Sequence, residues 1–227
     1  MTQFISVVVL IMWTGFVSAV PITYTNTQFL TDALATAGAN MASDSHASPP
    51  NPLPLSTTAA ATSDSLQDTA RSTSTANSNE LFASLDLDSF TENVNGVSTA
   101  EFIGDFVAPG GKVAITFALL NANSNGLGAA LDTSVALQVF SNGETILNEI
   151  FGADIGSTTL TFDLPQGALA RLDLLLLVTG DTTGGKASVA STLNFLAAPV
   201  QIPEAPTLTF MLAGLLLLSA SRRKVGL

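Results

Sequence analysis

The stretch Ser134–Phe151, SVALQVFSNGETILNEIF, decides the fold that the sequence predicts. Apolar and polar residues alternate through SVALQVF and again through TILNEIF, which is the period of a half-buried β-strand. Between the two segments stands Asn142-Gly143. A type I′ turn requires such a pair, because both of its central residues have positive φ. The stretch therefore predicts a β-hairpin and, with it, an antiparallel sheet.

Outward from this hairpin, the same alternation recurs in short segments that are separated by turn signals. Pro109–Gly111 and Pro165–Ala168 supply two of the turns. Segment 112–121 is apolar along most of its length, which favours a more central strand. The expected strands are 81–90, 99–108, 112–121, 134–140, 145–151, 157–164, 170–179 and 186–200.

These strands predict an all-β fold, with a single antiparallel β-sandwich over residues 80–201. A jelly roll and a closed barrel are alternatives that the pattern of strands does not separate from a simple sandwich.

Residues 20–79 differ in composition from the segments that follow. Ser, Thr, Ala, Asn and Asp dominate, with SPPNPLP at Ser48–Pro54 and STTAAATSDS at Ser56–Ser65. Bulky apolar residues are too few to offset the entropy of ordering the chain, so the segment is interpreted as a disordered, low-complexity spacer. It has no Asn-x-Ser/Thr sequon, so any sugar on it would be O-linked. Within it, Thr27–Ala37 carries an apolar stripe at helical spacing and predicts a short helix.

Both ends of the chain are apolar and predict terminal hydrophobic helices. Residues 1–19 have the length and the apolar core of a secretory signal peptide, with cleavage expected after Ala19, although no Lys or Arg follows Met1. Such a peptide implies export by the general secretory machinery.

The last segment, 202–227, contains a short apolar span at about 207–221 and then the basic cluster Arg222, Arg223 and Lys224. By the positive-inside rule this cluster stays in the cytoplasm, and everything before the span lies outside. The span is shorter than the ~20 residues of an ordinary transmembrane helix, which suits a transient anchor.

The order of features at this end carries a resemblance. Pro203, Glu204, Ala205 and Pro206 precede the span, and the basic cluster follows it at the extreme C-terminus. This resembles the PEP-CTERM sorting signal of exported proteins in Gram-negative bacteria, although the second proline is displaced by one residue. The resemblance implies recognition and removal of the tail by an exosortase, a membrane-embedded protease. It also implies a final place in the cell envelope or outside the cell, in association with exopolysaccharide or biofilm matrix.

Composition excludes several kinds of chemistry. The net charge is −11, and three of the seven Lys and Arg lie in the terminal cluster, so a nucleic-acid partner is not expected. The chain has no Cys, which excludes disulfides and thiolate chemistry. Its single His, His46, lies in SDSHASPPNP, where nothing would hold it as a catalytic triad requires.

A near-match to a phosphate-binding loop occurs at Gly180–Ser188, GDTTGGKAS. Ala187 stands where that motif needs a hydroxyl, and the loop lies between two expected strands and not before a helix. The stretch is therefore interpreted as a Gly-rich hairpin turn.

Asp86 and Asp88 are the candidate metal ligands. They lie two residues apart on one expected strand, hence on one face, where calcium could screen their repulsion. Asp154 with Asp163 or Asp132 forms a second candidate group. The alternative is a solvated acidic face that opposes edge-to-edge pairing, with no cofactor at all.

The leading functional hypothesis is a non-enzymatic, exported envelope or matrix protein with this sorting signal. A binding module for glycan or for a partner protein is the alternative, and an exported hydrolase is the third hypothesis. The only Trp and Tyr, Trp13 and Tyr24, precede the expected sandwich, so it lacks the usual platforms for sugar stacking.

Overall fold

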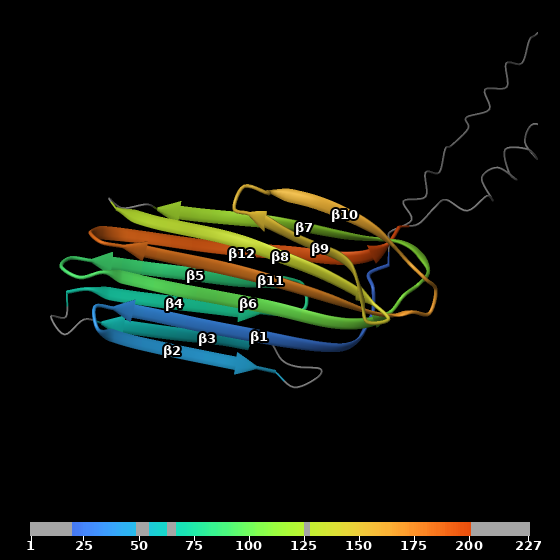
Figure 1. The fold of residues 1–227 in the computed structure, drawn as a ribbon, viewed down its shortest axis with the longest axis horizontal. Helices are drawn as coiled ribbons and strands as arrows, with labels where there is room; N and C mark the ends of the chain where they lie inside the picture. The colour runs from blue at the N-terminus through green and yellow to red at the C-terminus, as the bar shows by residue number, and fades with distance from the viewer. Residues whose placement is uncertain (1–19, 49–54, 63–66, 125–127, 201–227) are drawn as a thin grey trace, which may run out of the picture. The chain divides into compact units, whose positions relative to one another are not determined.

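The computed structural model describes residues 20–48, 55–62, 67–124 and 128–200, which contain twelve β-strands (Figure 1). Burial alternates along most of them, as it does throughout Val94–Val107. The strands are β1 (Tyr24–Ala37), β2 (Asn40–Ala47), β3 (Leu55–Thr62), β4 (Thr69–Ala76), β5 (Glu80–Ser89), β6 (Val94–Val107), β7 (Gly111–Ser124), β8 (Ala129–Ser141), β9 (Glu144–Gly152), β10 (Ser157–Leu164), β11 (Leu169–Thr182) and β12 (Gly185–Pro199).

The strands form two antiparallel sheets of six strands each. Sheet A has the order β2-β1-β6-β11-β8-β9, and sheet B has the order β10-β7-β12-β5-β4-β3. Each sheet ends in two edge strands, so the predicted β-sandwich is confirmed and a closed barrel is wrong. From β9 onward, each successive strand of the chain lies in the opposite sheet.

All eight strands expected from the sequence are present, as β5 to β12. The turn between β8 and β9 has φ of 51° at Asn142 and 85° at Gly143. Both values lie in the left-handed region, as a type I′ turn requires, so the predicted hairpin is confirmed.

The prediction of a disordered spacer over residues 20–79 is wrong, and so is the domain boundary at residue 80. β1 to β4 all lie in this segment, and residues 21–200 form one compact unit. Thr27–Ala37 belongs to β1 and is not a helix, because its buried residues alternate with a period of two. β1 pairs with β6, which is remote in sequence, and β4 pairs with the next strand, β5, so the backbone of the segment is satisfied within the two sheets.

Small side chains explain how so polar a segment forms part of a core. Apart from Leu55 at the start of β3, the inner faces of β3 and β4 carry only Ala, Ser and Thr, and Ser72 and Ser74 are completely buried. Ser72 Oγ donates to the backbone carbonyl of Val97 at 2.6 Å, and Ser98 Oγ donates to that of Thr73 at 2.6 Å. Both bonds cross from one sheet to the other. A serine side chain can reach the opposite backbone only if the sheets lie closer there than the usual ~10 Å.

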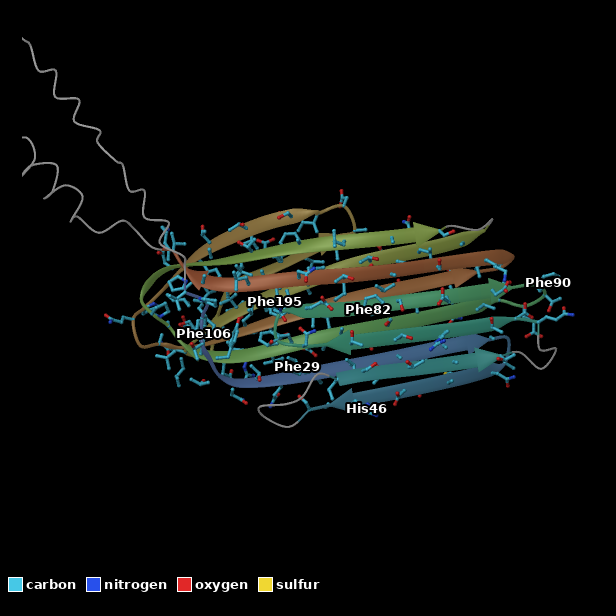
Figure 2. The ribbon with its side chains drawn as sticks, turned by 180° about the vertical axis from the view of Figure 1, so that it is seen from behind. Phe29, His46, Phe82, Phe90, Phe106 and Phe195 are labelled. Atoms are coloured by element: carbon cyan, nitrogen blue, oxygen red, sulfur yellow. The ribbon has the colours of Figure 1, made fainter. Side chains whose placement is uncertain are left out.

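Aromatic side chains fill another part of the core. Phe102 of sheet A meets Phe195 of sheet B with ring centroids 4.9 Å apart, and Tyr24 contacts Phe102 edge-to-face at 5.1 Å. Figure 2 shows Phe106 and Phe195 toward one end of the strands and Phe90 at the other. Tyr24 therefore packs against the core from within β1, so the prediction that it precedes the folded domain is wrong.

The signal peptide, the sorting signal, the apolar span and the basic cluster all lie outside the described residues. In the ranges that the structure does describe, no helix is long and apolar enough to cross a membrane.

Candidate functional site

The candidate site is a strip of side chains that crosses the outer face of sheet A. Strand alternation turns these residues outward, and the strand register aligns them in two adjacent rows across five strands. We call this set the polar strip; its rows are Asn26, Asp105, Arg171, Phe140 and Thr145, and Gln28, Ile103, Asp173, Gln138 and Asn148.

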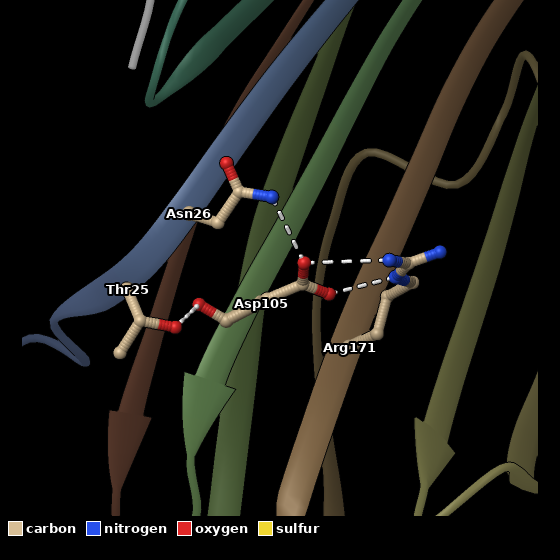
Figure 3. A network of polar contacts seen from close by, with 4 residues as sticks. All are labelled: Thr25, Asn26, Asp105 and Arg171. Carbon is tan, nitrogen blue, oxygen red and sulfur yellow. Dashed lines mark hydrogen bonds and ion pairs between the residues drawn. The ribbon is translucent and has the colours of Figure 1, made fainter. Parts of the chain in front are cut away.

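A hydrogen-bonded network fixes one half of the strip (Figure 3). Arg171 donates to both carboxylate oxygens of Asp105, from Nε at 2.7 Å and from Nη2 at 3.3 Å. Asn26 Nδ2 donates to Asp105 Oδ2 at 3.1 Å, and Thr25 Oγ1 donates to the Asp105 carbonyl at 3.0 Å. The hydrogen bond from Arg171 lowers the pKa of the Asp105 carboxyl, and the same bond raises the pKa of Arg171.

Beside this network the surface is hollowed by about 570 Å³. The lining includes Phe140, Arg171 and Asp173, together with Leu169 and Gly143. Phe140 is half-buried, so one part of its ring packs on the sheet and the other is open to the hollow. An apolar ring surrounded by hydrogen-bonding groups is the usual composition of a site for a small polar molecule.

A carboxyl pair adjoins the hollow. Glu101 of β6 and Asp173 of β11 are joined by a side-chain hydrogen bond. In the register of the sheet Glu101 stands between Leu30 and Leu175, which limit its access to water. Burial, then the hydrogen bond to Asp173 and its charge, raise the pKa of Glu101 from 4.5 to about 7, and burial raises the pKa of Asp173. The pair therefore retains a shared proton at mildly acidic pH.

The geometry of this pair bears on the hydrolase hypothesis. Glycosidases place their two carboxyl groups about 5 Å or more apart, on either side of the sugar bond. Two carboxyls in direct hydrogen-bond contact are closer than that, so Glu101 and Asp173 do not form such a catalytic pair as they stand.

The predicted metal ligands lie on the opposite sheet. Asp86 and Asp88 both project from the outer face of β5, as strand alternation predicts. Lys186 of β12 is the cation beside them, with Nζ 2.7 Å from Asp88 Oδ2, and Arg71 of β4 stands opposite Asp86. Lys186 therefore supplies beside Asp88 the positive charge that was predicted for calcium.

Two members of the second candidate group, Asp132 and Asp163, lie on different sheets. Asp163 forms an ion pair with Lys112 at 3.0 Å, whereas Asp132 lies on β8 in the other sheet, and Asp154 lies in the turn after β9. Among the described residues, no three or more acidic or His side chains are grouped as metal ligands would be.

The structure also places the two other candidates from the sequence, His46 and the stretch Gly180–Ser188. His46 is exposed on the edge strand β2, with Nε2 3.4 Å from Asp44 Oδ1. Gly180–Ser188 forms the end of β11, a turn at Thr183–Gly184 and the start of β12, so the prediction of a hairpin turn is confirmed.

Sequence reasoning missed every residue of the polar strip. The alternation of the strands does indicate that Phe140, Arg171 and Asp173 face outward from their sheet. It does not indicate that β8 and β11 are neighbours, or that β1 and β6 continue the same rows.

No family model matches this chain, and no curated protein matches it. One similar solved structure is described as "CBM4 structure and function", with 10% identity and a TM-score of 0.28 over 58% of this chain and 78% of that one.

Another is TmCBM61 in complex with β-1,4-galactotriose, with 11% identity and a TM-score of 0.28 over 52% of this chain and 71% of that one. A third is the enzymatically active domain of tailspike protein 4 from bacteriophage CBA120, with 14% identity and a TM-score of 0.26 over 59% and 19%. Similarities at this level do not assign a function.

Proposed function

We propose that this chain is an exported, non-enzymatic protein of the cell envelope or exopolysaccharide matrix, and that its β-sandwich binds glycan along the polar strip. The observation that carries the binding proposal is the composition of the strip. One aromatic ring, Phe140, stands among Arg, Asp, Gln, Asn and Thr side chains on a continuous sheet surface.

Sugar chemistry fits this arrangement. A pyranose ring presents C–H groups on its faces and hydroxyls around its edge, so it can stack on an aromatic ring while polar side chains bind its hydroxyls. Arg171 uses two of its five N–H donors on Asp105, which holds the guanidinium in place and leaves the others for a ligand. Gln138 Nε2 donates to Asn148 Oδ1 at 3.2 Å, so a second pair of amides is oriented beside the ring.

The positions of the two ends of the sandwich support the proposed export and the removal of both terminal segments. The N–H of Ile22 donates to the carbonyl of Ala197 at 2.9 Å, and the N–H of Val200 donates to that of Lys112 at 2.8 Å. The chain therefore enters and leaves the sandwich at neighbouring points. A fold with adjacent ends tolerates the removal of both terminal segments, because no strand is interrupted.

The sorting route itself rests on the terminal sequences. The signal peptide, the Pro-Glu motif, the short span and the basic cluster together favour export, a pause in the membrane and processing by an exosortase-type enzyme. The processed protein would then be released to the envelope or to the matrix outside it.

Binding is tested with the purified exported protein on a glycan array, followed by calorimetry with the best polysaccharide. We expect Phe140→Ala and Arg171→Met each to lower affinity about tenfold, which corresponds to ~1.4 kcal/mol. Phe82→Ala is the matched control, since Phe82 is a half-buried ring on the outer face of sheet B. An array without hits, or an equal loss in the control, would contradict the proposal.

A further inference from the structure

The edge strands on the two sides of the sandwich differ in how far their backbone groups are covered. On one side β2 and β3 cover each other, because side chains of β2 bind the backbone of β3. Asn40 Nδ2 donates to the carbonyl of Thr62 at 2.9 Å, and Asp44 Oδ2 accepts from the N–H of Thr58 at 3.2 Å. Two backbone groups of β3 at this edge therefore have partners within the sandwich, and covering an edge strand is one way in which proteins protect it.

On the other side, the edge of sheet A is β9, which pairs with β8 alone within the described residues. Its sequence, ETILNEIFG, contains neither Lys nor Pro, the residues that most often blunt an exposed edge. Ile150 is 74% exposed and Ile146 is 39% exposed. Leu147 and Phe151 are only partly buried, so the core also opens to solvent along this strand.

We propose that β9 is an interface for a second copy of this chain, paired antiparallel with the β9 of its partner about a two-fold axis at Asn148. A second copy is the favoured occupant because the strand is complementary to itself in this register. Ile146 lies opposite Ile150 of the other copy, and Leu147 lies opposite Glu149. Glu144 lies opposite Gly152, so no two carboxylates face each other.

Registers shifted by two residues are worse. A two-fold axis at Glu149 would place the two Glu149 carboxylates directly opposite each other, which is destabilising. An axis at Leu147 would separate Ile146 from Ile150 and place them opposite Asn148 and Glu144, so neither exposed isoleucine would have an apolar partner. The bulge at Ile146, where the register with β8 shifts, adds an exposed apolar side chain that the Asn148 register can cover.

Pairing about Asn148 joins the two copies of sheet A into one sheet. Asn148 is the last member of one row of the polar strip, so this row would run without a break from one copy into the other. The interface does not depend on the proposed glycan binding, because it is carried by the edge strand and its register alone.

The register is tested by cysteine cross-linking, for which the chain is well suited because it has no Cys. In the full exported protein, Asn148→Cys places two thiols on the two-fold axis, where Cα atoms of paired strands lie about 4.5–5.5 Å apart, within disulfide reach. Thr145→Cys is the matched control on the same strand. The two copies of that residue would lie six positions apart along the strand, about 20 Å.

We expect Asn148→Cys to give a covalent dimer under mild oxidation and Thr145→Cys to give at least tenfold less. Light scattering on the unaltered protein should show a dimer that Ile150→Lys converts to a monomer. Leu120→Lys is the control here, because Leu120 is 66% exposed on the outer face of sheet B. A monomer at ~100 μM, equal cross-linking of both Cys variants, or dissociation by Leu120→Lys alone would overturn the proposal. Glycan binding by a monomeric chain would leave the proposed function in place.

Discussion

Ser72 of β4 donates a hydrogen bond of 2.6 Å to the backbone carbonyl of Val97 on β6, and so links the two sheets through one small side chain. Ser72 is completely buried. The relationship shows that the Ser/Thr/Ala-rich strands β1 to β4 are an integral part of the sandwich, with two strands in each sheet. It also means that side-chain volume limits this part of the core.

Ser72 is the position at which this close packing is best tested. We expect Ser72→Ala to lower the free energy of unfolding by about 1 kcal/mol, through loss of the hydrogen bond. Ser72→Leu should lower the free energy of unfolding by ~1–3 kcal/mol or more, because the extra volume forces the sheets apart. Denaturant midpoints measure both effects, with Ser43→Leu on the exposed face of β2 as the control. If Ser72→Leu lowers the free energy of unfolding no more than Ser43→Leu does, the two sheets are not close at this point.

Limited proteolysis should define the corrected domain boundary. We expect a resistant fragment that begins before Tyr24 and ends near Val200, because β1 and β4 supply partners for β6 and β5. Mass spectrometry of the fragment identifies its ends. A stable core that begins near Glu80 would instead support a separate spacer. Expression of residues 80–200 alone should give insoluble protein, since β6 would lose its pairing partner β1 and the cover of β4, and β5 would lose its pairing partner β4.

The carboxyl pair predicts a dependence of stability on pH. The pKa of Glu101 is raised on folding, so the folded chain holds this proton more tightly than the unfolded chain does. The contribution of Glu101 to stability is therefore greatest below pH 4.5, and it falls as the pH rises from 4.5 to about 7. The expected effect is about 1 kcal/mol, or a few degrees in Tm.

Glu101→Gln and Asp173→Asn should each flatten this pH profile and raise Tm at pH 8, because either change removes one of two facing carboxylates. Thermal unfolding from pH 4 to pH 8 is the measurement. Profiles of both variants that run parallel to that of the unaltered chain would show that the pair does not titrate as described.

Calcium is tested through Lys186. Its ammonium group stands 2.7 Å from Asp88, where a cation would otherwise screen Asp86 and Asp88. We expect millimolar calcium to leave the Tm of the unaltered protein within about 1 °C of its value in chelator. Lys186→Met should produce a calcium-dependent rise, because a ligand that binds only the folded state stabilises it. A calcium shift in the unaltered chain that survives Asp86→Asn with Asp88→Asn would place a calcium site elsewhere.

The C-terminal sorting signal predicts that loss of its basic cluster impairs processing of the exported protein. Replacement of Arg222, Arg223 and Lys224 with Gln should impair membrane retention and removal of the tail, since these residues orient the span. Mass spectrometry of the exported protein should then detect an intact C-terminus. Gln substitution of Arg71 and Lys112, in the sandwich, is the control for lost charge. Normal processing of the terminal variant would remove the support for the sorting route.

The sequence by itself determined β5 to β12 and the turns between them. Alternation of apolar and polar residues is a local property, and so is the demand of a type I′ turn for Asn142-Gly143, so both can be recognised from one strand at a time. The outward direction of Asp86 and Asp88 follows from the same alternation.

Only the tertiary structure decided the rest. β1 became a strand because β6, far away in sequence, supplies its hydrogen bonds, and because Ala and Ser let the opposite sheet approach closely. The polar strip gathers side chains from five strands that are scattered along the chain. Strand order and sheet separation depend on which faces bury each other, and that choice is made by the whole fold and not by any single segment.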